Sequence, residues 1–240
     1  MELLTVNLGR LPYAEAYLVQ AAAVEEVVAR RETATAMIGT VFFVEHEPVV
    51  TVSRRPEARK NLVASEEMLR QAGVEVQETD RGGDVTYHGP GQIVCYPVLD
   101  LNVLNLGIHA YMRLLEQAVI DTCAEFGVGC GRDAGATGVW TLGADATPAS
   151  KIAACGVRVR KWVSMHGLAL NVAPEMRHFQ LIVPCGLVGR QVTSLKLELQ
   201  EKSPPLAQVQ AVLTSVLKRL IAAAHADAIE KRAHAARLMP

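Results

Sequence analysis

The sequence lacks the marks of several protein classes. No apolar run in its 240 residues approaches the roughly 18 residues that a membrane-spanning helix needs. The first residues, MELLTVNLGRLPY, have no basic start, apolar segment or cleavage site, which argues against a secretory signal. The net charge is −1, so charge gives no reason to expect nucleic acid or a membrane as a partner. These absences predict a cytoplasmic protein.

Cysteines are few and scattered, and cofactor motifs are missing. The five cysteines form no C-x-x-C pair, which argues against a disulfide scaffold or a zinc ribbon and favours a reducing compartment. The dinucleotide-binding glycine fingerprint and the P-loop lysine motif are also absent. We therefore expect no metal and no bound cofactor. The cysteines are Cys95, Cys123, Cys130, Cys155 and Cys185.

The predicted elements favour an α+β fold with a mixed sheet and flanking helices. No repeat or linker divides the chain, so residues 1–240 are predicted to form one domain with its core in about 1–200. Segments 37–44 and 49–52 look like a strand pair, and 92–99 is apolar on both faces, as in a central strand. The tail beyond about residue 222 is expected to fray. Further strands are predicted over 2–8, 74–77, 137–141, 151–163 and 164–172, and helices over 13–30, 65–73, 109–126 and 204–222.

The most unusual segment is RGGDVTYHGPG, residues 81–91, which is too rich in glycine for regular structure. It predicts a backbone wall against a substrate, with polar contacts from Arg81, Tyr87 and His88. A tight structural loop explains the same glycines equally well.

Two residues suggest nucleophilic chemistry. Cys185 follows an apolar run and precedes Gly186, which is how a cysteine nucleophile is often presented, although a lone cysteine is more often core filler. Lys151 opens the apolar segment KIAACGVRV, where a lysine usually marks a solvated strand end. Aimed inward at about 4 Å, its ammonium would favour a thiolate by about 4 kcal/mol before desolvation. Lowering a thiol pKa from about 8.5 to about 6.5 requires only about 2.7 kcal/mol. One lysine is therefore sufficient, with His88 and His166 as alternatives.

Two other sequence patterns suggest which ligands the protein would bind. Gly167 and Ala169 in HGLALNV could form a groove for an acyl chain, or simply part of a buried strand. Burying seven methylene groups is worth about 5–6 kcal/mol. Two basic clusters could dock an acidic protein, although a solvated face explains each cluster alone. They are Arg54, Arg55, Arg59 and Lys60, and Arg158, Arg160 and Lys161.

Four motifs in order resemble the lipoyl(octanoyl) transferases: RGGDVTYHGPGQ, KIAACGVRV, MHGLALNV and VPCGLVGRQVTSL. The resemblance covers about residues 5–200. It implies the fold shared by biotin and lipoate protein ligases. It also implies an acyltransferase that takes an octanoyl group from acyl carrier protein. The acceptor would be a lysine in the lipoyl domain of 2-oxoacid dehydrogenase complexes or of the glycine cleavage protein.

The resemblance also implies roles for residues. Cys185 would carry the acyl group as a thioester, and Lys151 would lower its pKa. An ATP-dependent lipoate ligase, or an inactive lipoyl-domain-binding module, are the alternatives. Oxidative pairing of Cys155 with Cys185 is left open. The substrate contacts would be Arg81, Gly82, Gly83, Asp84, Val85, Thr86, Tyr87, His88, Ala154, Cys155, Gly156, Gly167, Leu168 and Ala169.

Overall fold

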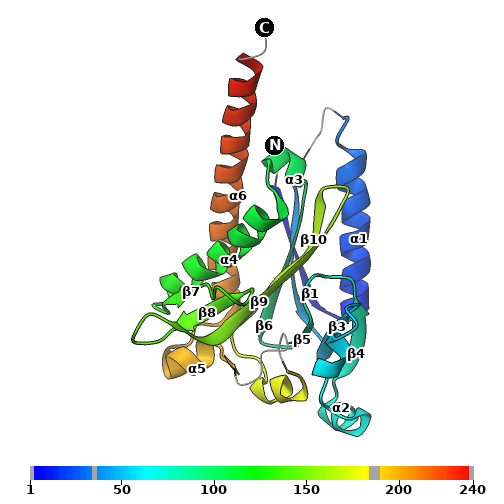
Figure 1. Ribbon diagram of the computed structural model, residues 1–240, viewed down its shortest axis with the longest axis vertical. Helices are drawn as coiled ribbons and strands as arrows, with labels where there is room; N and C mark the ends of the chain where they lie inside the picture. Colours follow the sequence, from blue (N-terminus) through cyan, green and yellow to red (C-terminus); the bar gives the residue numbers. More distant parts are fainter. Residues whose placement is uncertain (1–2, 34–36, 184–189, 238–240) are drawn as a thin grey trace.

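A computed structural model of the chain describes residues 3–33, 37–183 and 190–237 and shows a twisted mixed sheet with helices on both faces (Figure 1). A smaller sheet lies beside it. The larger sheet has the order β1 (Leu3–Leu11), β2 (Gly39–His46), β6 (Gln92–Leu99), β10 (Val163–Asn171), β9 (Pro148–Arg160), β8 (Val139–Leu142) and β7 (Cys130–Gly131), with β11 (Gln191–Val192) paired to β9. The smaller sheet has the order β4 (Glu75–Thr79), β3 (Val49–Ser53) and β5 (Val85–His88).

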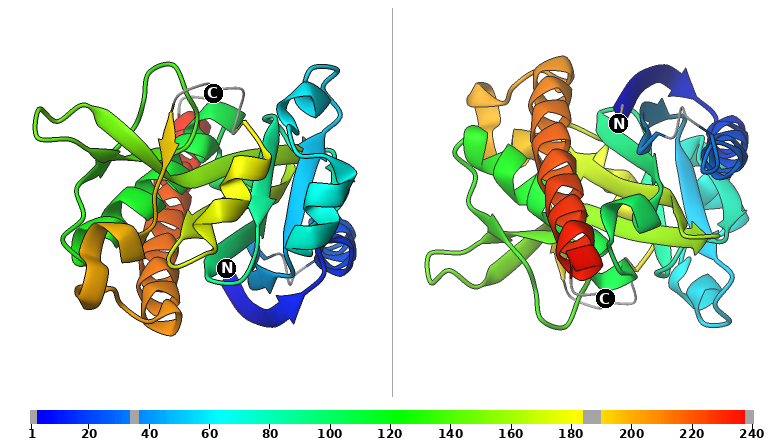
Figure 2. Two further views of the ribbon diagram at one scale, coloured as in Figure 1. Left: turned by 90° about the horizontal axis from the view of Figure 1, so that it is seen from below. Right: turned by 90° about the horizontal axis from the view of Figure 1, so that it is seen from above.

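The helices divide between the two faces of the larger sheet (Figure 2). On one face the side chains of α1 pack on β2, β6 and β10, whereas α4 and α6 cover the other face. The prediction of a mixed α+β sheet is confirmed. The helices are α1 (Tyr13–Ala29), α2 (Glu66–Ala72), α3 (Leu101–Leu104), α4 (Ile108–Glu125), α5 (Leu195–Leu199) and α6 (Leu206–Arg237), with short 3-10 helices at Ala58–Asn61, Met176–Leu181 and Gln200–Lys202.

Strand β6 is central, as its sequence predicts. It pairs with β2 on one side and β10 on the other, and all eight of its residues are buried. Because successive side chains alternate, Ile93 and Cys95 join the core under α4 and α6. Val94 and Tyr96 join the core under α1. Apolar residues are thus needed on both faces of the strand.

Three sequence predictions about the fold are wrong. Segments 37–44 and 49–52 do not pair: β2 lies in the larger sheet, whereas β3 pairs with β4 and β5. Segment 81–91 is not wholly irregular, because β5 lies inside it. The tail does not fray at 222, since α6 continues to Arg237. Alanine has the highest helix propensity, and Arg232 donates hydrogen bonds from this last part to the carbonyls of Asn102 and Val103.

Helix α6 is also more apolar than the sequence reading allowed. By length and composition alone, Leu206–Ala235 could cross a membrane, although only 28% of its most apolar window is buried inside the molecule. Its side chains at Leu213, Leu217 and Ile221 lie in the core beneath the larger sheet. The apolar stripe therefore has a partner within the fold.

Candidate active site

A cavity of about 440 Å³ lies between the 81–84 loop with β5 and the strands β9 and β10. It draws together three segments that are far apart in the sequence. All the predicted substrate contacts except Tyr87 line it: Arg81, Gly82, Gly83, Asp84, Val85, Thr86, His88, Ala154, Cys155, Gly156, Gly167, Leu168 and Ala169.

Tyr87 is the exception, because its side chain does not line the cavity. Its side chain is fully buried, and its hydroxyl lies 2.8 Å from Nδ1 of His178. The ring packs edge-on against Phe179. Side chains alternate along a strand, so Thr86 and His88 face the cavity while Tyr87 points into the core of the smaller sheet.

Glycines allow the 81–84 loop, on one side of the cavity, to pack closely on strand β9. The amide of Gly82 donates a hydrogen bond of 2.9 Å to the carbonyl of Val157 in β9. A Cβ on Gly156 would stand 2.6 Å from the Gly82 carbonyl oxygen, and one on Gly167 would stand 2.3 Å from the Cys95 carbonyl oxygen. Gly156 and Gly167 are cross-strand partners. The glycines thus allow close approach of one backbone to another.

Lys151 is buried, with only 6% of its surface exposed. It therefore does not mark a solvated strand end. It lines a small second cavity that shares Thr86, Ala154 and Ala169 with the main one. Its Nζ lies 5.4 Å from the centroid of the Trp140 ring, within reach of a cation–π interaction. The lysine therefore stands at one end of the main cavity.

Cys185 lies outside the described residues, but the chain is described on both sides of it. The amide of Val183 donates to the carbonyl of Asn61 at 2.7 Å. Val192 in β11 pairs with Lys151. The Arg190 guanidinium stacks on Trp140 at 4.2 Å and forms an ion pair with Asp133. Both flanks of residues 184–189 are thus fixed to neighbours of the two cavities.

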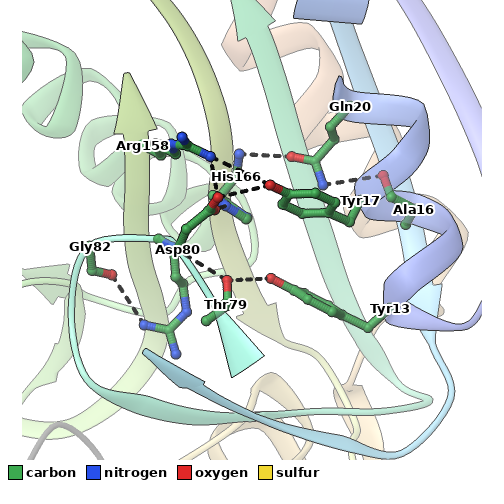
Figure 3. Close-up of polar contacts among 10 residues, drawn as sticks. Tyr13, Ala16, Tyr17, Gln20, Thr79, Asp80, Gly82, Arg158 and His166 are labelled. Carbon is green, nitrogen blue, oxygen red and sulfur yellow. Dashed lines mark hydrogen bonds and ion pairs between the residues drawn. The ribbon is translucent and has the colours of Figure 1, made fainter. Parts of the chain in front are cut away.

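His166, which lines the main cavity, belongs to a polar network shown in Figure 3. His166 Nε2 lies 2.9 Å from Oδ1 of Asp80, whose other oxygen accepts from the Tyr17 hydroxyl and pairs with Arg158. Burial raises the pKa of Asp80, but the hydrogen bonds from His166 and Tyr17 and the charge of Arg158 outweigh it and hold the pKa below its usual value. Burial lowers the pKa of His166 despite the carboxylate, so the ring is a neutral donor to Asp80 near pH 7.

Comparison with known proteins now settles the family. A family model described as "Lipoyl protein ligase A/B catalytic domain" matches residues 17–218. The chain belongs to this family. An octanoyltransferase of Acidobacterium capsulatum is 45% identical over 91% of this chain and 89% of its own length. One from Bacteroides fragilis is 43% identical over 88% of this chain and 94% of its own. Within the family, the chain is thus an octanoyltransferase-type acyltransferase of lipoate biosynthesis.

Solved structures support the fold alone. A bi-partite lipoate protein ligase from Thermoplasma acidophilum superposes with a TM-score of 0.68 at 15% identity, covering 92% of this chain and 84% of its own. A lipoate-protein ligase A bound with ATP gives 0.67 at 14%, covering 92% and 86%. A biotin protein ligase from Aquifex aeolicus gives 0.51 at 11%, covering 91% and 70%. The predicted likeness to the biotin and lipoate ligase fold is confirmed.

Aromatic side chains outside the predicted set of substrate contacts also line the cavity. Tyr13 stacks on His88, and His46 Nε2 lies 2.7 Å from the Tyr96 hydroxyl. Tyr13, Tyr96 and His166 all line the cavity.

The two basic clusters differ. Arg158 pairs with Asp80, and Arg160 and Lys161 pair with Glu25 at 2.8 and 3.4 Å. In the first cluster Lys60 pairs with Glu57. Within the described part of the chain, the guanidinium groups of Arg54, Arg55 and Arg59 have no carboxylate partner, and Arg55 lines the cavity mouth. Among the residues that the structure describes, the first of the two clusters therefore keeps positive charge without a carboxylate partner beside the cavity.

Proposed function

We propose that this octanoyltransferase-family chain carries the octanoyl group on Cys185, with Lys151 favouring the thiolate. The donor is octanoyl-acyl carrier protein, and the acceptor is the ε-amine of a lipoyl-domain lysine. A cytoplasmic location belongs to the same proposal. The observation that supports it most is the burial of Lys151 at the end of a cavity lined by Ala154, Gly156 and Ala169.

The reaction has two acyl transfers. In the first, the Cys185 thiolate attacks the thioester carbonyl of the donor, the bond to the phosphopantetheine sulfur breaks, and that sulfur leaves as a thiolate. In the second, the neutral lysine amine attacks the new thioester and the Cys185 thiolate leaves. The proton lost by the amine balances the proton gained by the phosphopantetheine thiol. Neither transfer consumes ATP.

The electrostatics support Lys151 in this role. Only 6% of the Lys151 surface is exposed, so little water is present to screen the charge of its ammonium. Val192 pairs with Lys151 along the backbone, and the Thr193 amide donates to the Lys151 carbonyl at 2.9 Å. Because Cys185 precedes Val192 by seven residues, the chain is long enough to bring a thiol to the ammonium.

The charge beside the cavity supports octanoyl-acyl carrier protein as the donor. Acyl carrier protein is acidic, and Arg54, Arg55 and Arg59 offer unneutralised positive charge near the mouth of the cavity, within the described residues. Electrostatic complementarity of this kind raises the rate of encounter more than the affinity. We propose this cluster, and not Arg158, Arg160 and Lys161, as the docking surface.

The test is intact mass spectrometry after incubation with octanoyl-acyl carrier protein and no ATP. The protein should gain one octanoyl group, which hydroxylamine should remove, and Cys185→Ser should neither gain it nor transfer it. Full transfer by Cys185→Ser would contradict the thioester mechanism. A requirement for ATP would favour the lipoate ligase alternative, and no transfer at all would favour a binding module.

A further inference from the structure

His166 occupies an unusual backbone conformation for a residue inside a strand. Its φ is +58°, in the left-handed region that non-glycine residues rarely adopt. In a regular strand, Met165 and His166 would face opposite sides of the sheet. Met165 packs in the core under α1, yet His166 also contacts that side, through the rings of Tyr17 and Tyr96. The local distortion turns the imidazole toward the cavity.

The surroundings hold the ring in this orientation (Figure 3). The His166 amide donates to Oε1 of Gln20 at 2.8 Å, and the buried Gln20 side chain also donates to the Ala16 carbonyl within α1. On the other side, Nε2 is fixed by Asp80 at 2.9 Å. A strained conformation that its neighbours enforce is found most often at functional sites.

The main cavity extends from its border with the small Lys151 cavity toward His166. At one end it adjoins the Lys151 cavity at the cross-strand pair Ala154 and Ala169. At the other end stands the pair of Val157 and His166, three residues further along β9. His166 is only 2% exposed, so this is an inner end and not a mouth.

We propose that the His166 ring sets the length of the acyl chain by closing this inner end. The inference rests on the proposed function, which places the acyl carbonyl at the Lys151 end. Three strand steps of about 3.3 Å give a length of about 10 Å. An octanoyl chain with bonds of about 1.5 Å extends for about 9 Å, whereas a dodecanoyl chain needs about 14 Å. An octanoyl chain fits before the ring, and a dodecanoyl chain meets it.

The experiment compares kcat/KM for octanoyl, decanoyl and dodecanoyl thioesters of acyl carrier protein. The wild type should disfavour dodecanoyl by at least about a hundredfold. His166→Gly removes the ring and suits the positive φ, so it should raise the dodecanoyl-to-octanoyl ratio at least about tenfold. Tyr17→Phe is the matched control: it removes a hydrogen bond to Asp80, but Tyr17 does not line the cavity, so the ratio should not change.

Three results would overturn the inference. The wild type could use dodecanoyl as well as octanoyl thioesters. This measurement needs no variant, so it tests the inference even if His166→Gly fails to fold. His166→Gly could lose activity with an unchanged ratio, which would mean a structural role alone. Tyr17→Phe could shift the ratio equally, which would mean general loosening. Failure of the thioester mechanism appears separately, as unchanged transfer by Cys185→Ser.

Discussion

Gly138 leaves the space that the Lys151 side chain fills. A Cβ on Gly138 would stand 2.7 Å from Cε and 3.3 Å from Nζ of Lys151, and 2.5 Å from the Ala153 carbonyl oxygen. The φ of Gly138 is +114°, a conformation that other residues rarely adopt. Close approach and backbone conformation thus both require glycine beside the lysine.

We expect Gly138→Ala to lower octanoyl transfer at least about tenfold, because the new methyl group displaces the Lys151 ammonium. Gly135→Ala is the control, since its Cβ would meet only Asp133 Oδ1 at the ordinary distance of 3.5 Å. The measurement is single-turnover acylation with octanoyl-acyl carrier protein, with circular dichroism to show that both variants fold. Equal rates for Gly138→Ala and the wild type would show that the lysine tolerates displacement.

Replacing the lysine tests the electrostatic role directly. Lys151→Ala should slow acylation mainly by lowering the thiolate fraction of Cys185 near pH 7. Raising the pH should therefore recover part of the lost rate, and Lys151→Arg, which keeps a positive charge, should lose less. The apparent thiol pKa comes from the pH dependence of alkylation. An identical thiol pKa in wild type and Lys151→Ala would refute the role.

Much of the site could be predicted because the sequence signals for it lie within short segments of the chain. The glycines of 81–91 and the small residues of β9 and β10 signal close backbone approach within their own segments. The sequence did not show that the Tyr87 side chain points into the core of the smaller sheet, because the face that a strand residue presents depends on where the strand begins, and the glycine-rich pattern hides this. The left-handed conformation of His166 depends on Gln20 in α1, 146 residues earlier, so nothing near His166 in the sequence announces it.

The errors in the fold have a similar origin. Proximity in sequence suggested that β2 and β3 pair, but their partners come from β6 and from β4 and β5. Pairing is decided by which faces must be buried, and that is a property of the whole sheet. The end of α6 was misjudged because its anchor, Arg232, binds carbonyls in α3 more than 120 residues away.

Buried histidines predict a loss of stability in acid. Burial lowers the pKa of His46 to about 4 and that of His88 to about 3. The unfolded chain binds protons near pH 6.5 while the folded chain does not, so stability falls as pH drops from about 6.5 toward 4. His46 alone would contribute on the order of 3 kcal/mol to this loss. Urea unfolding at pH 7 and pH 4.5 measures it.

Two variants isolate the histidine contribution. His46→Gln should flatten the pH dependence, even though losing the bond to Tyr96 lowers stability at pH 7. His109→Gln, at an exposed position on α4, is the control for a histidine substitution outside the buried cluster. A wild type equally stable at both pH values would contradict the neutral, buried state of these rings.

The free basic cluster should govern the encounter with the carrier protein. Arg54 and Arg59 are exposed and do not line the cavity, so replacing both with Glu should leave the chemistry intact. We expect KM for octanoyl-acyl carrier protein to rise at least about tenfold and its salt dependence to weaken, because the attraction is lost. Transfer from octanoyl-pantetheine, which has no protein partner, should not change. Arg160→Glu is the matched control, since Arg160 is already neutralised by Glu25. If KM is unchanged in the double variant, or rises equally in Arg160→Glu, the cluster is a solvated surface and the carrier docks elsewhere.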